Sequence, residues 1–370
     1  MNNEKISFHG IRILTAIALS FVVISCNGQE ITSDRQNKKK EEKTLSNDKN
    51  VEIKKSDNQG AQTSFPAINL NNQISQVVRT VFQDSRGDIW FGTQNGAFRH
   101  SGKSLIHIDS IRSELGKGVT IKDIAEDKNG KLWFGHTNGV SSIDGDIVTN
   151  YYESDGLISN DVWSIAADKN GEIWIGTIDG VCKFDRSHFT VFEIPEGKFD
   201  STLGVSSTKM IHDIMEDSKG RLWFSTNGGI YIKDNSMLTN LSEKDGLTTS
   251  FVNQVIEDKK GLFWISTSKG LFCLKGDSLI NMTELLFKDN KGTGSIIEDS
   301  KGNIWFNCHR SIYSLYENGL TEYPIEEGNN GPLTFQIYED QQNRLWFVGY
   351  GGAYRYENEK FVNITENGPW

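Results

Sequence analysis

Residues 84–96 read DSRGDIWFGTQNG, and residues 168–180 repeat this pattern as DKNGEIWIGTIDG. The pattern occurs seven times, with its tryptophan at Trp90, Trp133, Trp174, Trp223, Trp264, Trp305 and Trp346. An aspartate stands six residues before each one, at Asp84, Asp127, Asp168, Asp217, Asp258, Asp299 and Asp340. Successive tryptophans are 43, 41, 49, 41, 41 and 41 residues apart. A period of this length indicates a repeat architecture, in which one small unit is built several times.

Each repeat is expected to form four antiparallel strands. The Asp-x-x-Gly step fits a tight turn, because aspartate bonds its own backbone and glycine adopts a positive φ without strain. Six repeats carry this glycine and the seventh carries Asn343, which is the next most favourable residue in that conformation. One apolar run precedes the aspartate, a second holds the tryptophan, and two more follow, as at 353–356 and 361–364. We interpret the seven aspartates as turn caps and not as catalytic or metal-binding groups.

Seven such units of about 41 residues predict an all-β fold, a seven-bladed β-propeller of four-stranded antiparallel blades over residues 65–370. A tryptophan at one fixed place in each blade is expected to form a ring of packing between blades. An open solenoid would need polar capping repeats, and the end repeats here resemble the middle ones. The outermost strand of the last blade could come from 361–365 or from the segment near 65–68.

The repeat resembles the two-component regulator propeller repeat, and this resemblance covers roughly residues 74–356. It implies a sensor-type propeller, since relatives include periplasmic halves of hybrid histidine kinases in Bacteroidetes that are associated with glycan sensing. In those sensors two propellers precede a further β-domain, a membrane helix and a kinase. Only one propeller is expected here, without a kinase, so signalling does not carry over directly. The Asp-box of sialidases places its aspartate five residues before the tryptophan, so no glycosidase is inferred.

The N-terminal residues indicate export. Residues 1–26 place Lys5 and Arg12 before an apolar run that ends in Val-Ile-Ser-Cys, the layout of a secretory signal. These last four residues resemble the lipobox of bacterial lipoproteins, which implies that Cys26 is the lipid anchor. Residues 27–64 contain no aromatic residue and are rich in charged and amide side chains, which predicts a disordered tether. We therefore expect a membrane-anchored lipoprotein that faces the periplasm or the cell surface.

Composition excludes several classes of protein. The chain has 39 Lys and Arg against 49 Asp and Glu, a net charge of −10, which argues against a nucleic-acid partner. Four cysteines in 370 residues do not make a disulfide scaffold. Cys182, Cys273 and Cys308 are expected to be small core residues. The seven histidines form no set with metal-ligand spacing, and no metal or cofactor is expected.

Binding residues in a repeat protein are sought where the repeats differ. Eleven residues before each repeat tryptophan, where the inner strand begins near the central channel, stand Arg79, Lys122, Trp163, His212, Asn253, Gly294 and Phe335. A second variable register lies three residues after each tryptophan, at Thr93, His136, Thr177, Thr226, Thr267, Cys308 and Gly349. Alternating strands bring both registers to one face. The ligand-binding candidates are Arg79, Lys122, Trp163, His212, Asn253 and Phe335, with His136, His309, Arg310 and Tyr350 from the second register or just beyond it.

These residue types suit an oligosaccharide or an acidic small ligand, because cations, amides and aromatic rings recognise such molecules. The longest spacing adds residues around 193–210, and a longer loop there could cover a ligand. The favoured function is recognition of a glycan, a small molecule or a partner protein. Two alternatives stay open, a polysaccharide lyase or hydrolase acting at the channel mouth and an envelope assembly scaffold. No catalytic residue can be chosen from the sequence.

Overall fold

The computed structural model describes residues 53–55, 72–102, 104–198, 207–287, 291–308, 310–316, 319–324 and 333–370. All of these belong to the second of two units into which the chain divides, 51–370. The predicted signal peptide (1–26) with Cys26, the segment near 65–68 and His309 lie outside the described residues. So does the predicted tether, apart from three residues discussed below.

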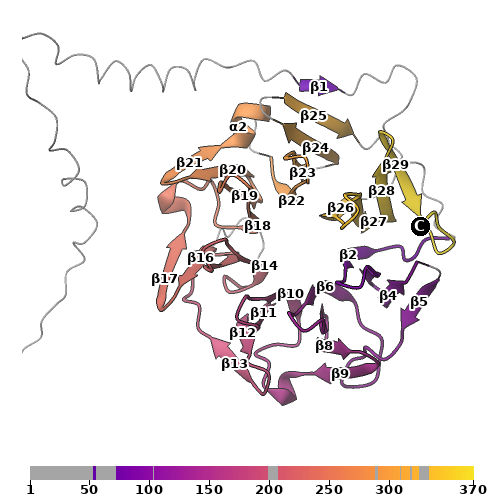
Figure 1. Cartoon of the computed structure of the whole chain (residues 1–370). Coiled ribbons are helices and arrows are strands. Elements are labelled where there is room, and N and C mark those ends of the chain that lie inside the picture. The colour runs from indigo at the N-terminus through magenta and orange to yellow at the C-terminus, as the bar shows by residue number, and fades with distance from the viewer. Residues whose placement is uncertain are drawn as a thin grey trace, which may run out of the picture. The chain divides into compact units, whose positions relative to one another are not determined.

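The described residues form seven sheets arranged as a ring of blades around a central axis (Figure 1). In each blade the strands pair antiparallel in chain order, from the innermost strand to the outermost. Blades 1 to 4 contain β2 (Val78–Gln83), β3 (Ile89–Thr93), β4 (Gly96–His100), β5 (Leu105–Ile108); β6 (Ile121–Glu126), β7 (Leu132–His136), β8 (Gly139–Asp144), β9 (Ile147–Tyr151); β10 (Val162–Ala167), β11 (Ile173–Thr177), β12 (Gly180–Phe184), β13 (Phe189–Phe192); and β14 (Ile211–Glu216), β15 (Leu222–Thr226), β16 (Gly229–Asp234), β17 (Met237–Leu241). Blades 5 to 7 contain β18 (Val252–Glu257), β19 (Phe263–Thr267), β20 (Gly270–Lys275), β21 (Ser278–Asn281); β22 (Thr293–Glu298), β23 (Ile304–Cys308), β24 (Ser311–Tyr316), β25 (Gly319–Pro324); and β26 (Leu333–Glu339), β27 (Leu345–Tyr350), β28 (Gly352–Glu357), β29 (Lys360–Ile364).

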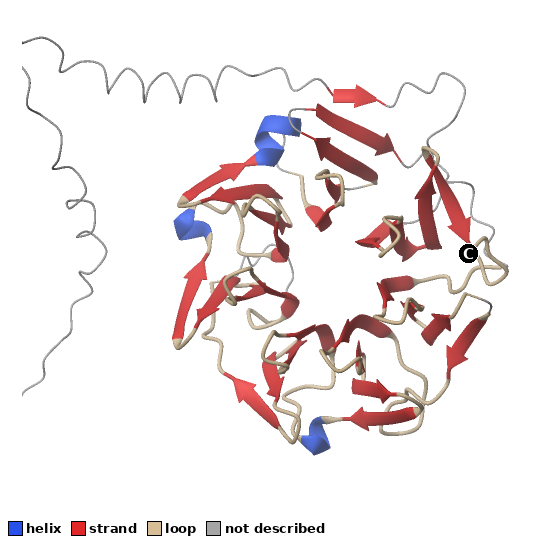
Figure 2. Ribbon diagram, in the orientation of Figure 1, coloured by secondary structure: helices blue, strands red, loops and turns tan. Residues whose placement is uncertain are grey.

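The predicted seven-bladed, four-stranded β-propeller is confirmed. Helical turns are few among the described residues and lie in connections: the 3-10 turns η1 (Glu153–Asp155) and η3 (Glu243–Asp245), and α2 (Met282–Phe287) (Figure 2). Within the same residues, no helix has the length and apolar character needed to cross a membrane.

Each repeat aspartate organises the turn between the first and second strands of its blade. In blade 1, Oδ1 of Asp84 accepts the N–H groups of Arg86 and Asp88 at 3.0 and 2.9 Å. Oδ2 accepts the indole N–H of Trp90 at 2.9 Å, and the indole nitrogen lies within 3.4 Å of this oxygen in all seven blades. The spacing of six residues is therefore set by a bond between the turn and the tryptophan. Asn343 takes the turn position of the six glycines with φ of 59°, as predicted.

The repeat tryptophans hold neighbouring blades together. Trp90 of blade 1 packs in one buried cluster with Phe134 of blade 2, with ring centroids 5.4 Å apart. An equivalent cluster recurs around the ring, with Ile175 and Ile265 in place of the phenylalanine in blades 3 and 5, up to Trp346 of blade 7, which packs on Phe91 of blade 1 at 5.7 Å. The predicted ring of tryptophans between blades is thus confirmed.

A second set of contacts between blades lies at the aspartate turns. The residue after the turn aspartate donates to a carboxylate at the end of the next inner strand, as Ser85 does to Glu126 at 2.8 Å. Equivalent bonds reach Glu216, Glu257, Glu298 and Glu339. Blade 3 carries Ala167 in this register, so the bond from blade 2 is missing there.

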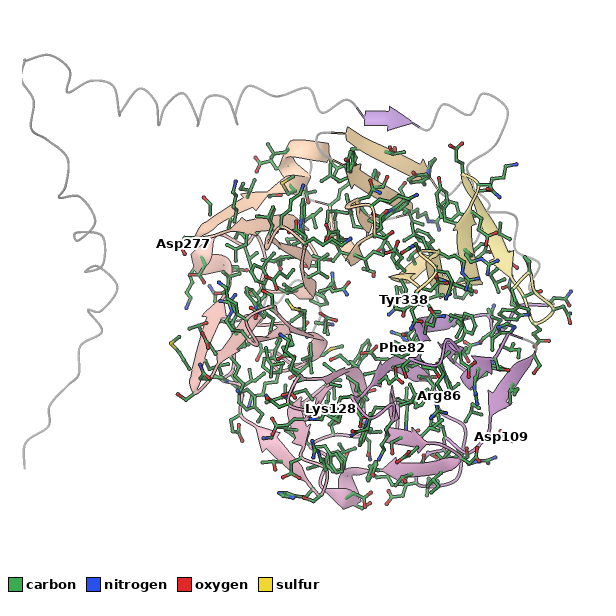
Figure 3. The ribbon with its side chains drawn as sticks, viewed as in Figure 1. Phe82, Arg86, Asp109, Lys128, Asp277 and Tyr338 are labelled. Atoms are coloured by element: carbon green, nitrogen blue, oxygen red, sulfur yellow. The ribbon has the colours of Figure 1, made fainter. Side chains whose placement is uncertain are left out.

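The ring closes between blade 7 and blade 1. The outermost strand of blade 7 is β29, which settles the two alternatives in favour of the C-terminal residues. The backbone N–H of Gln83 donates to the Tyr338 hydroxyl at 3.1 Å, and Phe82 lies beside Tyr338 near the centre of the ring (Figure 3). The C-terminal Trp370 stacks on His100 of blade 1 at 3.9 Å between ring centroids.

Blade 6 has a fifth strand that the sequence did not suggest. The short strand β1 (Ile53–Lys55) pairs in parallel with β25 at the outer edge of this blade. These three residues fall within the segment predicted to be a tether, so that prediction does not hold for them. An exposed edge strand offers unpaired backbone groups, which explains how a polar segment can add to it.

Candidate functional site

The innermost strand of every blade carries a β-bulge near its start. In blade 1, Val78 pairs with Thr93 and Thr80 pairs with Gly92, so Arg79 is the extra residue without a partner. The extra residues in the other blades are Lys122, Trp163, His212, Asn253 and Phe335, and in blade 6 the irregularity spans Gly294 and Ser295. These are the residues of the first variable register. A bulge re-aims a side chain out of the regular pleat, which explains why this register is free to vary.

The bulges surround a cavity of about 290 Å³ at one mouth of the central channel. It is lined by Arg79, Thr80, Lys122, Asp123, Trp163, His212, Asp213, Asn253, Gln254, Gly294, Ser295, Thr334, Phe335 and Gln336. The structure thus brings together six of the predicted ligand-binding residues, one from each of blades 1 to 5 and one from blade 7. Gly294 contributes no side chain, and the amide of Asn307 lies where a Cβ would project.

Trp163 is the centre of a polar and aromatic group on one side of the cavity. Its indole N–H donates to Oδ2 of Asp161 at 3.1 Å. The Lys122 ammonium lies 3.6 Å from the Trp163 ring centroid and pairs with Oδ1 of Asp161. The Arg79 guanidinium lies 5.5 Å from the Trp163 ring and 5.0 Å from the ring of Phe335. Burial lowers the pKa of both cations, and the charge of Asp161 opposes this shift.

In blades 2 and 4 to 7 the residue after the bulge bonds its blade to the next one. Asp123 accepts the backbone N–H of Ile165 at 2.8 Å, Gln254 accepts that of Ile296 at 2.8 Å, and Gln336 accepts that of Val81 at 2.7 Å. Asp213 accepts the N–H of Val255 in the same way. These side chains line the cavity, but the hydrogen bonds that they accept from the next blade already explain why polar residues occur at these positions.

Among the residues that follow the bulges, Asp123 and Asp213 are titratable. Burial raises the pKa of Asp123 to about 7. Burial and then the charge of Asp123 raise the pKa of Asp213 to about 7. Oδ2 of Asp213 is buried without a hydrogen-bond partner among the described residues. The inner channel therefore disfavours negative charge.

His212 and Asn253 also line the cavity, and each is already engaged. His212 bonds Oδ1 of Asn227 at 2.6 Å, lies 4.6 Å from Phe251 between ring centroids, and has a pKa lowered by burial. The amide of Asn253 donates to the carbonyl of Thr293 in the next blade at 2.7 Å. Both side chains form part of the cavity wall, and each already makes a hydrogen bond within the protein.

The second variable register lies at the end of the second strand, where its side chains bond the hairpin that follows. Thr93 accepts the N–H of Asn95 at 3.0 Å and donates to the carbonyl of Gly96 at 2.8 Å, which closes the hairpin between the second and third strands. His136 takes this place in blade 2: it is fully buried, and Nδ1 accepts the N–H of Asn138 at 3.2 Å. Burial lowers the pKa of His136 to about 3. His136 is not part of the cavity lining: it ends β7, the second strand of its blade, where it pairs with Ile121 and is buried.

The remaining candidates lie away from the cavity lining. Arg310 is exposed in the turn between β23 and β24. Tyr350 is 40% exposed and accepts a hydrogen bond from the Gln76 amide at 3.2 Å, beside the closure of the ring. Within the segment 193–210, residues 195–198 border a second cavity of about 630 Å³ at blade 4.

Two further residues were missed by the sequence reasoning. Asp161 and Phe251 each lie at a fixed place, two residues before a repeat's bulge residue, yet only the structure shows their contacts with Trp163 and His212. Cys182, Cys273 and Cys308 are buried free thiols, as expected. Among the described residues, no group of three or more His, Cys, Asp and Glu side chains is placed to hold a metal ion.

Comparison with known families supports the repeat assignment. The family described as two component regulator propeller matches residues 72–95, 115–138, 156–179 and 204–228. The predicted resemblance is therefore confirmed for these four segments, which lie in and before blades 1 to 4. A search of curated proteins found no significant match.

Solved structures with the same fold include proteins of different activity. The extracellular domain of BT3049, a B. thetaiotaomicron protein assigned to the hybrid two-component systems, aligns at 24% identity with a TM-score of 0.61, over 81% of this chain and 40% of that one. Virginiamycin B lyase from Staphylococcus aureus aligns at 14% identity with a TM-score of 0.60, over 76% and 95%. The WD40 propeller domain of Doa1 aligns at 10% identity with a TM-score of 0.55, over 79% and 96%. This chain spans about 40% of the first of these, and all three share its fold.

Proposed function

We propose that this propeller is a recognition protein that binds a small ligand, such as a glycan fragment, at the channel mouth formed by the bulges. The observation that carries the proposal is the convergence of six different bulge side chains on one cavity, in a molecule whose turn aspartates and tryptophans repeat from blade to blade. Cations and aromatic rings on a rigid frame suit a ligand with polar groups and an apolar face.

The size of the cavity limits the ligand. A volume of about 290 Å³ is at the lower end of the range for small-molecule sites. One or two sugar rings, or a metabolite of that size, is therefore the expected occupant. A longer glycan would place only its terminal residues here.

The test is a thermal-shift screen of the full-length protein with a panel of neutral and acidic saccharides and small organic acids, followed by calorimetry of the hits. We expect Phe335→Ala to lose binding while keeping the melting temperature, because Phe335 is 43% exposed. Tyr316→Ala is the matched control, since Tyr316 is an exposed aromatic residue, 53% exposed, at the far end of β24.

Three outcomes would separate this proposal from its alternatives. If no compound raises the melting temperature and a stable protein partner is recovered instead, the scaffold role replaces ligand binding. Turnover of a saccharide would favour an enzyme at the same mouth. Equal loss of binding in the Phe335 and Tyr316 variants would place the ligand elsewhere.

We also propose that the chain is exported and anchored through Cys26. The layout of residues 1–26 supports this proposal, and the extracellular domain of BT3049 has the same fold. Cys26→Ser should move the protein from the membrane fraction to the soluble fraction. Retention in the membrane would contradict lipid anchoring.

A further inference from the structure

Arg79 differs from Lys122, the other Lys or Arg side chain that lines the cavity, in having no polar partner among the described residues. Within the described residues, its guanidinium makes no hydrogen bond and no ion pair within 4.0 Å, and its contacts are with the rings of Phe335 and Trp163. A guanidinium has five N–H donors in a planar fork. All of these donors are thus free for a ligand in a cavity that Arg79 lines.

Lys122 provides the contrast. Its side chain is 7% exposed, its ammonium pairs with Asp161, and it lies over the Trp163 ring at 3.6 Å. The Asp161 carboxylate is therefore committed to Lys122 and to the indole N–H of Trp163. It reaches Arg79 only through space, as an attraction that opposes the effect of burial on the pKa of Arg79. Lys122 therefore has a carboxylate partner, whereas Arg79 has none within 4.0 Å among the described residues.

The surroundings of Arg79 hold it in place. Two aromatic rings within about 6 Å of a guanidinium attract it through their faces, and they restrict the side chain without using its donors. Phe335 comes from blade 7 and Trp163 from blade 3, so the arginine is held from two directions across the mouth. Fixing the fork in advance reduces the entropy that a ligand would otherwise lose on binding.

We propose that Arg79 is the anion-recognition residue of this site and that the ligand is a small ring compound bearing a carboxylate. The carboxylate would accept two parallel hydrogen bonds from the fork, and the face of the ring would pack on Phe335. The inference rests on the proposed function, because it names the ligand class of the same cavity. A planar fork matches the two oxygens of a carboxylate, while a lysine presents a single charge.

The inner wall of the cavity restricts where that carboxylate can lie. Asp123 and Asp213 line the same cavity, and burial disfavours negative charge beside them. The anionic end of the ligand is therefore expected beside Arg79. Neutral hydroxyl or ring atoms would face the two aspartates.

The experiment is calorimetric titration of the full-length protein with two matched pairs of probes. D-glucuronate and D-glucose share a sugar ring and differ at the carboxylate, and benzoate and benzyl alcohol do the same for an aromatic ring. We expect at least one carboxylate probe to bind about tenfold more tightly than its neutral partner. The pair that shows the difference identifies the ring as a sugar or an aromatic group.

Variants then assign the effect to one side chain. Arg79→Gln should remove the preference for the carboxylate, and Arg79→Lys should restore part of it, because charge returns without the fork. Arg310→Gln should change nothing, since Arg310 is exposed outside the cavity. The melting temperature of each variant shows that the fold is kept.

The inference fails if the wild type and Arg79→Gln bind the carboxylate probes equally, or if no carboxylate probe binds. It also fails if the neutral partners bind as tightly as the carboxylates. In that last case binding that depends on Phe335 would still support the proposed function, so the two proposals are separable.

Discussion

The two ends of the innermost strands follow different rules. At the aspartate turns the seven blades use the same residues for the same bonds, and each indole N–H meets the aspartate six residues earlier. At the bulges the blades present an arginine, a lysine, a tryptophan, a histidine, an asparagine, a glycine and a phenylalanine. At one end of the channel the same residues stabilise every blade, and at the other end each blade presents a different side chain. A mutation should therefore have consequences that depend on which end it touches.

The sharpest test compares two tryptophans of blade 3. Trp174 is 2% exposed between blades, whereas Trp163 lines the cavity. We expect Trp174→Ala to lower the free energy of unfolding by about 4 kcal/mol, because it leaves a large cavity in the core. Trp163→Ala should cost about 1 kcal/mol and remove ligand binding. Urea denaturation and calorimetry measure the two effects, and similar stability losses would contradict the division.

A smaller effect separates two aspartates of blade 4 by their pH dependence. Asp213, at the bulge end, has a pKa raised from 3.8 to about 7, so its contribution to stability falls as the pH rises through that interval. Burial alone would raise the pKa of Asp217 too, but the bonds from Trp223 and Arg221 outweigh it and the pKa is lowered. The stability from Asp217 is therefore present above pH 3.8 and is lost as the pH falls below it.

Asparagine substitutions reveal this contrast. Asp213→Asn should raise the free energy of unfolding at pH 8 more than at pH 5. Asp217→Asn should lower it by about 2 kcal/mol at pH 6, because an amide N–H would then face the indole N–H, and by less at pH 3.5. Denaturation curves at these pH values provide the measurement. The same pH profile for both variants would show that the two ends do not differ in this way.

The smallest expected effect is a gain in stability at the turn end. Ala167 interrupts the series of carboxylates that accept bonds from the preceding blade, as Glu126 does from Ser85. Ala167→Glu should restore the bond from the backbone of Lys128 and stabilise the protein by about 0.5 kcal/mol. Ligand affinity should not change. A loss of stability would mean that this turn is held differently from the other turns.

The fold could be predicted from the sequence because the repeated residues are those that form tight turns. The spacing of Asp84 from Trp90 occurs seven times, a glycine stands between the two residues in six of the copies, and each copy supports the others. The bulge register, with Arg79 and Phe335, could be found by the same alignment, since it is where the copies disagree. The bond that His136 makes could not be predicted, because only the structure shows that its Nδ1 accepts the turn N–H that a threonine accepts in blade 1. The pairing of Lys122 with Asp161 could not be predicted, because the position two residues before the bulge carries a different residue in every blade.

The closure between blades 7 and 1 has a consequence for folding kinetics. The four antiparallel strands of each blade are contiguous in sequence, so most strand pairing is local and can proceed as the chain emerges. Contacts such as that of the Val81 N–H with Gln336 join residues 255 positions apart and can form only when the last blade is present. Arg79 and Phe335 face each other across this closure. The proposed anion site would therefore be completed in the final step of folding, and the appearance of ligand binding during refolding would report that the ring has closed.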